Sequence, residues 1–208
     1  MGTPSDILEI TPEKVDFRAY SISWNLTKRC NLNCDHCYLD ADFRGGFRTD
    51  ELDTNQCKKV IDQIAEVNPN AFLILTGVEP LLRPDIYELV RYAADKKFMV
   101  VLGTNGTLIN EVNAKKIKAA GAHGVGISID SMDATKHNKF RGVSGAWEHS
   151  MEAFNVLNEV GVDFLIQMSV SDMNYREIPD VVAFTEKIGA IAFNLYFLVC
   201  TGRGQGNT

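Results

Sequence analysis

The chain is organised around one short run of sequence, Cys30-Asn31-Leu32-Asn33-Cys34-Asp35-His36-Cys37. Three cysteines so close together can all contribute thiolates to one metal centre. Thiolate ligands suit zinc, copper(I) and iron–sulfur clusters, and a 4Fe–4S cluster normally takes four protein ligands. Because this run supplies three, one iron of such a cluster would stay open to a ligand that is not a cysteine.

Zinc is the alternative that this run leaves open. A structural zinc site has four ligands in a closed tetrahedron, so His36 or the distant Cys57 has to complete it. His36 directly precedes Cys37, and adjacent side chains do not easily share one tetrahedron. Cys57 falls on an apolar helical stripe and is interpreted as a core residue. The odd number of five cysteines, in a chain without secretory features, argues against a disulfide framework.

Composition narrows the class of protein. A length of 208 residues gives one substantial core and most simply one domain. The net charge of −6 argues against a nucleic-acid-binding surface, which needs clustered Lys and Arg. No run approaches the roughly 18 apolar residues of a membrane span, and residues 1–13 lack the apolar segment of a signal peptide. We therefore expect a cytoplasmic protein with reduced thiols and no membrane partner.

Apolar strands alternate with amphipathic helices from Tyr20 onward. Strands are predicted at residues 20–26, 71–75, 98–102, 125–129, 164–170 and 191–199. Helices are predicted at residues 53–65, 83–93, 110–120, 146–160 and 176–188. Six strands with a helix between each pair indicate an α/β fold with a parallel sheet and right-handed crossovers. Periodicity alone leaves open whether the sheet curls into a partial barrel or lies flat and doubly wound.

Polar or small residues end every predicted strand, although parallel strands are usually apolar on both faces. They are Asn25 and Thr27, Thr76 and Gly77, Thr104 and Asn105, Ser128 and Asp130, Gln167 and Ser169, and Asn194 and Tyr196. In barrel enzymes the carboxyl ends of the strands carry the active site. Glycine turns at residues 76–80 and 103–106 also let bare backbone approach a ligand there. We expect these residues and the cysteine loop to converge on one rim.

Two motifs together resemble the radical S-adenosylmethionine (radical SAM) superfamily. The first is Cys30-x-x-x-Cys34-x-x-Cys37 after a first strand, and the second is Thr76-Gly77-Val78-Glu79-Pro80, close to a Gly-Gly-Glu-Pro motif. The resemblance implies a parallel six-stranded (β/α)6 partial TIM-type barrel. Residues 20–203 are the expected catalytic core, after a lead-in of residues 1–19. Residues 204–208 form a glycine-rich tail, interpreted as a candidate truncation point.

The resemblance also implies the ligands of a 4Fe–4S cluster and of SAM. Cys30, Cys34 and Cys37 would hold the cluster, and SAM would bind the open iron through its amino and carboxylate groups. The resemblance implies that His36 lies near the adenine and that Gly77, Val78 and Glu79 line the methionine amino group. It places Asn105, Ser128 and Asp130 near the ribose and the carboxylate of SAM. It also places Gln167 near the ribose and Arg141 at the carboxylate. A solvent-facing side chain is the alternative for both His36 and Arg141. No catalytic side chain is expected beyond the cluster and SAM.

Val78 departs from the family pattern, which has glycine at this position. Valine is stiff and costly at positive φ, and it adds bulk where backbone is expected to meet SAM. If the turn needs a glycine conformation there, SAM binding suffers. A core that binds cluster and SAM with impaired catalysis is therefore one alternative function.

Three further stretches resemble one subgroup of the superfamily: Ser23–Thr27, His36–Ala41 and Cys200–Gly204. The subgroup includes heme and heme d1 biosynthesis enzymes and maturases of peptides or metallocofactors. Many members carry a C-terminal extension with auxiliary-cluster cysteines, which is expected to be absent here. Cys200 would then be structural or an orphan, and the structural role is the one expected. The implied function is reductive cleavage of SAM to a 5′-deoxyadenosyl radical that takes hydrogen from a tetrapyrrole side chain or a peptide. The implied electron donor is a reductant such as ferredoxin or flavodoxin, and a zinc-stabilised α/β binding module is the alternative.

Overall fold

A computed structural model describes residues 20–39, 41–45 and 50–206, so the expected lead-in lies outside the described residues. Six strands form one sheet in which every neighbouring pair is parallel. Their order is β1 (Ser21–Asn25), β4 (Phe72–Thr76), β5 (Met99–Thr104), β6 (Gly124–Ser128), β7 (Phe164–Val170) and β8 (Phe193–Phe197). The prediction of six parallel strands joined by helices is confirmed.

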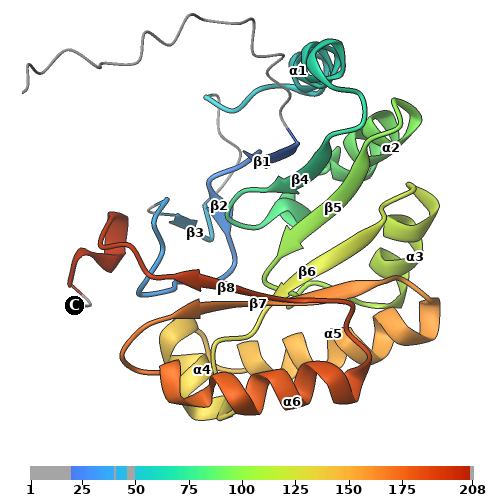
Figure 1. The fold of residues 1–208 in the computed structure, drawn as a ribbon. Helices are drawn as coiled ribbons and strands as arrows, with labels where there is room; N and C mark the ends of the chain where they lie inside the picture. Colours follow the sequence, from blue (N-terminus) through green and yellow to red (C-terminus); the bar gives the residue numbers. More distant parts are fainter. Residues whose placement is uncertain (1–19, 40, 46–49, 207–208) are drawn as a thin grey trace, which may run out of the picture.

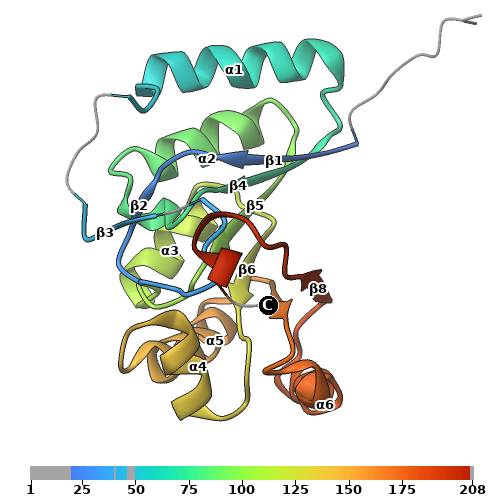
Figure 2. The ribbon, with the colours of Figure 1, turned by 90° about the vertical axis from the view of Figure 1, so that its left-hand side faces the viewer.

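The sheet curls into a half-barrel with the helices along its outer side, as Figure 2 shows. The helices are α1 (Thr54–Val67), α2 (Ile86–Asp95), α3 (Glu111–Ala119), α4 (Ala134–Arg141), α5 (Ala146–Val160) and α6 (Ile178–Ile188). Short 3₁₀ turns are η1 (Pro80–Leu82), η2 (Tyr175–Glu177) and η3 (Gly202–Gly206). Among the described residues, no helix combines the length and apolar character needed to cross a membrane. The curled arrangement settles the question between a partial barrel and a flat sheet.

Local sequence signals explain where the helices begin. Asp53 accepts a hydrogen bond from Gln56 N at 2.8 Å, and the Gln56 side chain accepts one from Asp53 N at 2.9 Å. This reciprocal pair is a capping box at the start of α1, where the sequence predicts a helix from residue 53. The prediction that α2 begins at Arg83-Pro84 is wrong. The η1 turn precedes this pair, Asp85 occupies the N-cap position, and the helix begins at Ile86.

The core fills the space between the outer face of the sheet and the helices. Its largest fully buried side chains include Phe98, Phe154, Ile61, Leu73, Leu102 and Ile127. Burying each such side chain contributes about 1.5–3 kcal/mol, so the strand ends are held on a rigid support. Cys57 is 1% exposed and belongs to this core, as predicted.

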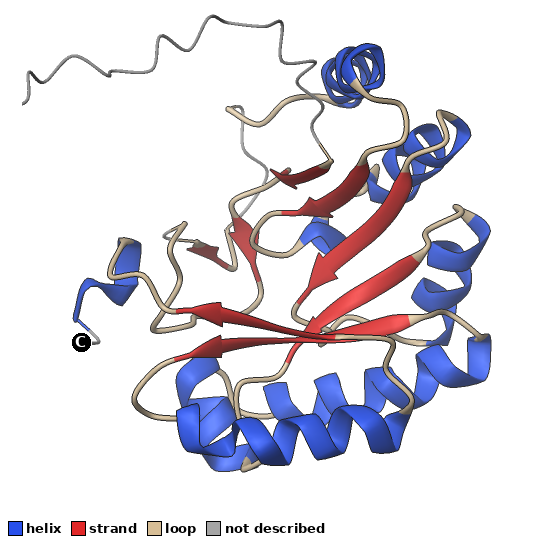
Figure 3. Ribbon diagram, in the orientation of Figure 1, coloured by secondary structure: helices blue, strands red, loops and turns tan. Residues whose placement is uncertain are grey.

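A second, smaller layer lies at the carboxyl ends of the strands. The short strands β2 (Arg29–Cys30) and β3 (Asp42–Phe43) pair in parallel and flank the cysteine loop. Figure 3 shows them on the side to which the arrows of the large sheet point. Sequence periodicity does not predict this pair, because two-residue strands carry no repeat. The pair fixes the two ends of the cysteine loop over the rim of the half-barrel.

Candidate functional site: a cysteine loop over the strand ends

The three predicted cysteine ligands lie in one small cluster, separate from the main core. Cys30 is 2% exposed and Cys34 is 8% exposed, while Cys37 is half-buried against them. Val78, from the turn after β4, packs against the same cluster. The structure therefore brings the cysteine motif and the turn after β4 together, as expected if both lie on one rim of the sheet.

The C-terminal end of α4 holds the first part of the cysteine loop. Asn33 N donates to Arg141 O and Asp35 N donates to Phe140 O, both at 3.1 Å. Gly142 ends α4 with a φ of +68°, and a Cβ at this position would lie 2.1 Å from Asn33 O. Only glycine permits both this conformation and this close approach. The backbone carbonyls at the end of α4 and the missing side chain of Gly142 therefore fix the path of the cysteine loop.

In the absence of a metal, burial favours the protonated form of the Cys30 and Cys34 thiols by raising the pKa of each. It raises the pKa of Cys30 to about 12. Burial also raises the pKa of Cys34, although the neighbouring Arg141 guanidinium acts against this rise. Metal coordination deprotonates such thiols outright. The site therefore favours a strongly cationic occupant over free thiolates.

The donor set fits a multi-iron cluster better than a closed zinc tetrahedron. Within the described ranges, no three His, Cys, Asp or Glu side chains are already placed to hold a single metal ion. A 4Fe–4S cluster takes each cysteine on a different iron, so its sulfurs need not converge on one point. Cys57 cannot complete a zinc site, because it packs in the main core, where its Sγ lies 3.8 Å from Arg83 Nη2. Three loop cysteines remain, which fits a cluster with one open position.

His36 is half-buried, so the solvent-facing alternative for this residue is wrong. Its ring stacks on Phe140 with centroids 4.0 Å apart and planes 12° from parallel. Burial, reinforced by Arg141, lowers the pKa of His36 to about 4, so the imidazole is neutral at neutral pH. Its Nδ1 is buried without a hydrogen-bond partner. A neutral stacked ring with a spare polar atom suits contact with a heteroaromatic base, and the adenine contact stays a prediction.

The turn after β4 places its special conformation on Gly77 and not on Val78. Gly77 has a φ of +123°, and a Cβ there would lie 2.8 Å from both N and O of Thr27. Among described residues, the non-glycines with positive φ are Arg44 and Lys97. The turn therefore needs no glycine conformation at Val78, because the chain reverses one residue earlier, and the condition under which backbone strain at Val78 would weaken SAM binding is not met. Val78 instead donates its amide to Thr27 O at 3.0 Å and packs its side chain on the cysteine cluster.

Glu79 is fully buried, and its carboxylate is occupied by neighbouring protein donors. It accepts hydrogen bonds from Thr104 Oγ1 at 2.8 Å, Asn105 N at 2.9 Å and Leu81 N at 3.0 Å. Burial raises the pKa of Glu79, and these donors act against the rise. The side chain ties the ends of β4 and β5 together. Glu79 thereby holds the turn, and its predicted contact with the SAM amino group stays a prediction.

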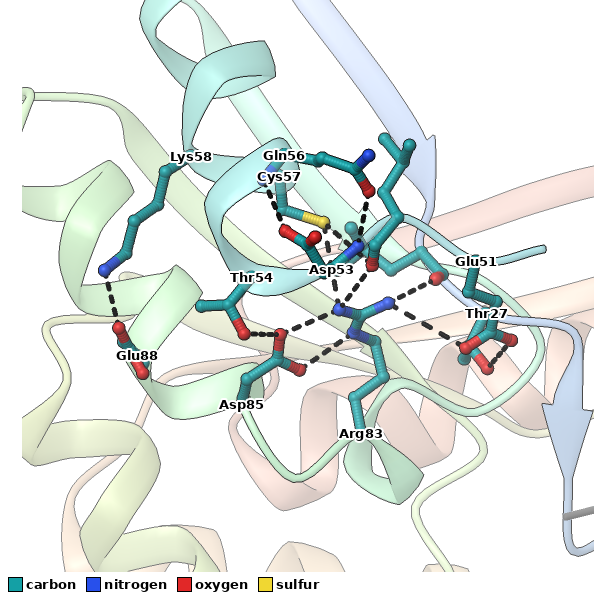
Figure 4. Close-up of polar contacts among 12 residues, drawn as sticks. Thr27, Glu51, Asp53, Thr54, Gln56, Cys57, Lys58, Arg83, Asp85 and Glu88 are labelled. Carbon is teal, nitrogen blue, oxygen red and sulfur yellow. Dashed lines mark hydrogen bonds and ion pairs between the residues drawn. The ribbon is translucent and has the colours of Figure 1, made fainter. Parts of the chain in front are cut away.

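A buried ionic network around Arg83, drawn in Figure 4, is connected to the same turn through Thr27. Arg83 is 5% exposed and its Nη2 lies 2.7 Å from Asp85 Oδ2. Glu51 lies 3.9 Å from Arg83 Nη1 and accepts a hydrogen bond from Thr27 Oγ1 at 2.6 Å. Thr27 in turn accepts the amide of Val78. The network therefore fixes the backbone on which the Gly77–Glu79 turn rests.

Asn105 connects the end of β5 to the cysteine loop. Its Nδ2 donates to Asn31 Oδ1 at 2.9 Å and lies 4.0 Å from Cys30 Sγ. Its Oδ1 accepts the amide of Thr107 at 2.9 Å. Asn105 is therefore placed beside the predicted cluster ligands, where sequence reasoning placed it only near the ribose and carboxylate.

Asp130 and Arg141 form a buried ion pair beside Cys34. Arg141 Nε lies 2.6 Å from Asp130 Oδ2, and its Nη1 lies 3.9 Å from Cys34 Sγ. Burial alone would raise the pKa of Asp130, but Arg141, with His36 and His137, holds it below its usual value. The solvent-exposed alternative for Arg141 is wrong, since this residue is 7% exposed. The pair places a positive charge next to the cysteine cluster.

Ser128 and Gln167 are neighbours in register on β6 and β7. Gln167 Nε2 lies 3.4 Å from Tyr196 Oη, and a Cβ on Gly126 would lie 2.9 Å from the same Nε2. The missing side chain of Gly126 thus makes room for Gln167. Both predicted residues are half-buried at the carboxyl end of the sheet, and their contacts to the ribose stay predictions.

Sequence reasoning missed two contributors to this site and misplaced one residue. It missed Phe140, which stacks on His36, and Arg203, which donates to backbone carbonyls of the cysteine loop. The signal for Arg203 was present in the sequence Gly202-Arg203-Gly204, which was noted only as a subgroup resemblance. Cys200 does not pack as a structural residue, because it is exposed.

Comparison with known proteins identifies the family. Residues 24–185 match the family model described as the radical SAM superfamily. The chain is 41% identical over 188 residues to the AdoMet-dependent heme synthase of Nitratidesulfovibrio vulgaris, covering 89% of this chain and 50% of that protein. It is 31% identical over 184 residues to the antilisterial bacteriocin subtilosin biosynthesis protein AlbA of Bacillus subtilis, covering 88% and 40%. The chain thus spans about half the length of the curated relatives it matches.

A solved structure supports the fold assignment independently. Streptococcus suis SuiB bound to S-adenosylmethionine shares the fold with a TM-score of 0.74 at 17% identity, covering 88% of this chain and 41% of that one. The matched family region contains the cysteine loop, the Gly77–Glu79 turn and the Asp130–Arg141 pair. From the family match over most of its length, we conclude that this chain belongs to the radical SAM superfamily.

Proposed function

We propose that this chain is a catalytic core that binds a 4Fe–4S cluster through Cys30, Cys34 and Cys37 and binds SAM at the remaining open position. The observation that carries the proposal is the gathering of these three cysteines in one buried cluster with Val78. When bound, the cluster supplies an electron for reductive cleavage of SAM to methionine and a 5′-deoxyadenosyl radical that removes hydrogen from a substrate.

The protein's own side chains bind, orient and shield in this proposal. Arg141 offsets negative charge beside Cys34, and Asp130 fixes its orientation. Gly77 brings bare backbone to the rim, and Glu79 holds that turn against β5. None of these groups is required to transfer a proton in this proposal.

The substrate is proposed from the relatives. One is named as a heme synthase and another as a bacteriocin biosynthesis protein, so the two classes are a tetrapyrrole side chain and a ribosomally made peptide. We favour the tetrapyrrole, because the heme synthase is more similar in sequence, at 41% against 31% identity. A cytoplasmic reductant such as ferredoxin or flavodoxin would supply the electron. All five cysteines lie within the described residues and are free thiols, which supports a reducing compartment.

The activity is tested by anaerobic incubation of the reconstituted protein with SAM and dithionite, followed by quantification of 5′-deoxyadenosine and methionine. We expect both products in equal amounts from the unmodified protein and none from Cys37→Ser. Cys57→Ser is the matched control, because Cys57 lies in the main core away from the loop, and it should retain SAM cleavage. No product from fully reconstituted protein, or equal product from Cys37→Ser, would contradict the proposal.

A further inference from the structure

The turn that follows the last strand lies directly on the cysteine loop. Gly202, the first residue of η3, has a φ of +56°, and a Cβ on it would lie 2.5 Å from Cys37 O and 2.7 Å from Tyr38 O. No side chain fits at this approach. In Figure 1 the turn lies on the same side of the large sheet as β2 and β3, beyond the end of β8. Residues more than 160 positions apart in sequence are therefore packed backbone to backbone.

Arg203 joins this turn to the loop through three hydrogen bonds. Its backbone N donates to Cys37 O at 3.0 Å. Its guanidinium donates from Nε to Cys34 O at 2.9 Å and from Nη1 to Ala41 O at 3.0 Å. A planar guanidinium presents donors in a fixed fork, so it can hold two separate carbonyls in one geometry. Two of the three carbonyls belong to predicted cluster ligands.

The two halves of the loop are anchored through different backbone groups, amides in the first half and mainly carbonyls beyond it. The end of α4 accepts loop amides, those of Asn33 and Asp35. Arg203 instead donates to loop carbonyls, those of Cys34, Cys37 and Ala41. The α4 anchor therefore acts before Cys37, and the Arg203 anchor extends the support beyond it. The guanidinium also brings positive charge to the loop, in addition to that of Arg141.

We propose that Arg203 is a positioning residue that holds the second half of the cysteine loop and raises the reduction potential of the cluster bound there. The geometric part stands on the observed contacts alone, and the electrostatic part rests on the proposed function. Nearby positive charge stabilises the reduced, more negative form of a cluster, and hydrogen bonds and charge are recognised controls of its potential. The last strand and the cluster loop are thereby coupled through one side chain.

The geometric part is tested by amide hydrogen exchange on the cluster-free protein. We expect Arg203→Ala to speed exchange in peptides covering residues 33–43 by about tenfold or more, with no change in β4 to β6. Arg203→Lys keeps the positive charge but loses the planar set of guanidinium donors. The rate of amide exchange in the loop of this variant should therefore lie between those of the unmodified protein and Arg203→Ala. Arg91→Ala is the matched control, because Arg91 also donates to a backbone carbonyl, that of Ala119, on the outer helices. Unchanged exchange in the loop, or equal acceleration throughout the chain, overturns the positioning role.

The electrostatic part is tested by redox titration of the reconstituted cluster. We expect a lower potential in Arg203→Ala and a potential near that of the unmodified protein in Arg203→Lys. An unchanged potential in Arg203→Ala at equal iron content overturns this part, since a merely structural role would alter iron content alone. If the unmodified protein holds no cluster, the proposed function fails, while the exchange experiment still decides whether Arg203 positions the loop.

Discussion

Two buried carboxylates on the rim, Glu79 and Asp130, are stabilised in different ways. Both are almost completely inaccessible, at 0% and 1% exposure. Glu79 accepts only from neutral donors, two backbone amides and one hydroxyl, and burial raises its pKa. Asp130 faces the Arg141 guanidinium, and its pKa is lowered although burial acts in the opposite direction. Neutral hydrogen-bond donors do not fully offset the free-energy cost of burying an ionised carboxylate, whereas a paired cation can offset it.

The difference assigns separate tasks to the two regions. The Glu79 region, which includes the Gly77–Val78 turn, fixes backbone geometry where β4 and β5 end. The Asp130 region keeps an arginine charge beside Cys34. The resemblance implies a SAM contact for both carboxylates, and those contacts stay predictions. The structure shows that one positions a turn and the other positions a charge.

The largest effect is expected from Asp130→Asn, which leaves the buried Arg141 guanidinium without its counter-charge. Breaking a buried ion pair from one side costs about 3–5 kcal/mol. The free energy of unfolding, measured with urea on the cluster-free protein, should fall by this amount. Asp62→Asn removes one partner of an exposed pair with Lys96 and serves as the control, with little expected change. Equal losses of stability in the two variants would mean that the buried Asp130–Arg141 pair matters no more to stability than an exposed ion pair.

Gly77→Ala should have the next largest effect, in the Glu79 region. The substitution adds a Cβ 2.8 Å from the Thr27 backbone at a φ of +123°, and such backbone strain costs about 1–3 kcal/mol before any clash. Gly189→Ala is a matched control, because Gly189 also has a positive φ, +75°, but has no atom within 4 Å of the added Cβ. Thermal unfolding should show a larger loss for Gly77→Ala. An equal loss for both would show that the close approach to the Thr27 backbone carries no cost.

The pH dependence of stability should separate the two carboxylates by sign. Because the pKa of Asp130 is lowered, its contribution is present above the ordinary value of 3.8 and is lost as pH falls through the folded-state pKa. Because the pKa of Glu79 is raised, its contribution is present below the ordinary value of 4.5 and is lost as pH rises through the folded-state pKa.

Urea unfolding between roughly pH 3 and pH 8 tests these signs. Asp130→Asn should flatten the loss of stability on the acid side. Glu79→Gln should flatten the loss that accompanies rising pH. If the two variants altered the same limb of the profile in the same direction, the contrast between the carboxylates would be wrong.

Val78→Gly should have the smallest effect. Val78 is not at positive φ, so glycine relieves no strain, and the substitution loses a partly buried side chain and adds backbone freedom. We expect a loss of about 1–2 kcal/mol in the free energy of unfolding and no gain in SAM affinity, measured by equilibrium binding. A clear gain in affinity would support the alternative of a core impaired by Val78.

The sequence predicts those parts of the molecule that repeat or are locally encoded. The six strands, the capping box at Asp53 and the burial of Cys57 all follow from periodicity or from short-range hydrogen bonding. Helix α4 was missed because its sequence, ATKHNKFR, has no apolar stripe, and its buried residues include His137 and Arg141. Their burial depends on Asp130 and the cysteine loop, which periodicity cannot show.

Long-range contacts account for the other differences. Arg203 reaches Cys34 across a separation of 169 residues, so no local pattern could assign its partners. The motif left open whether Val78 needs a glycine conformation, and the close approach of Gly77 to Thr27 shows that the chain reverses one residue earlier. The motif located the site, and tertiary contacts decided how each residue serves it.

Anaerobic reconstitution with iron and sulfide, followed by EPR of the reduced protein before and after SAM addition, tests the central claim most directly. We predict about four irons per chain, a signal that changes on SAM addition, and loss of both in Cys34→Ser but not in Cys57→Ser. Tight binding of zinc in place of iron, or a reduced cluster whose signal does not respond to SAM, would contradict the assignment of an open cluster site to the cysteine loop.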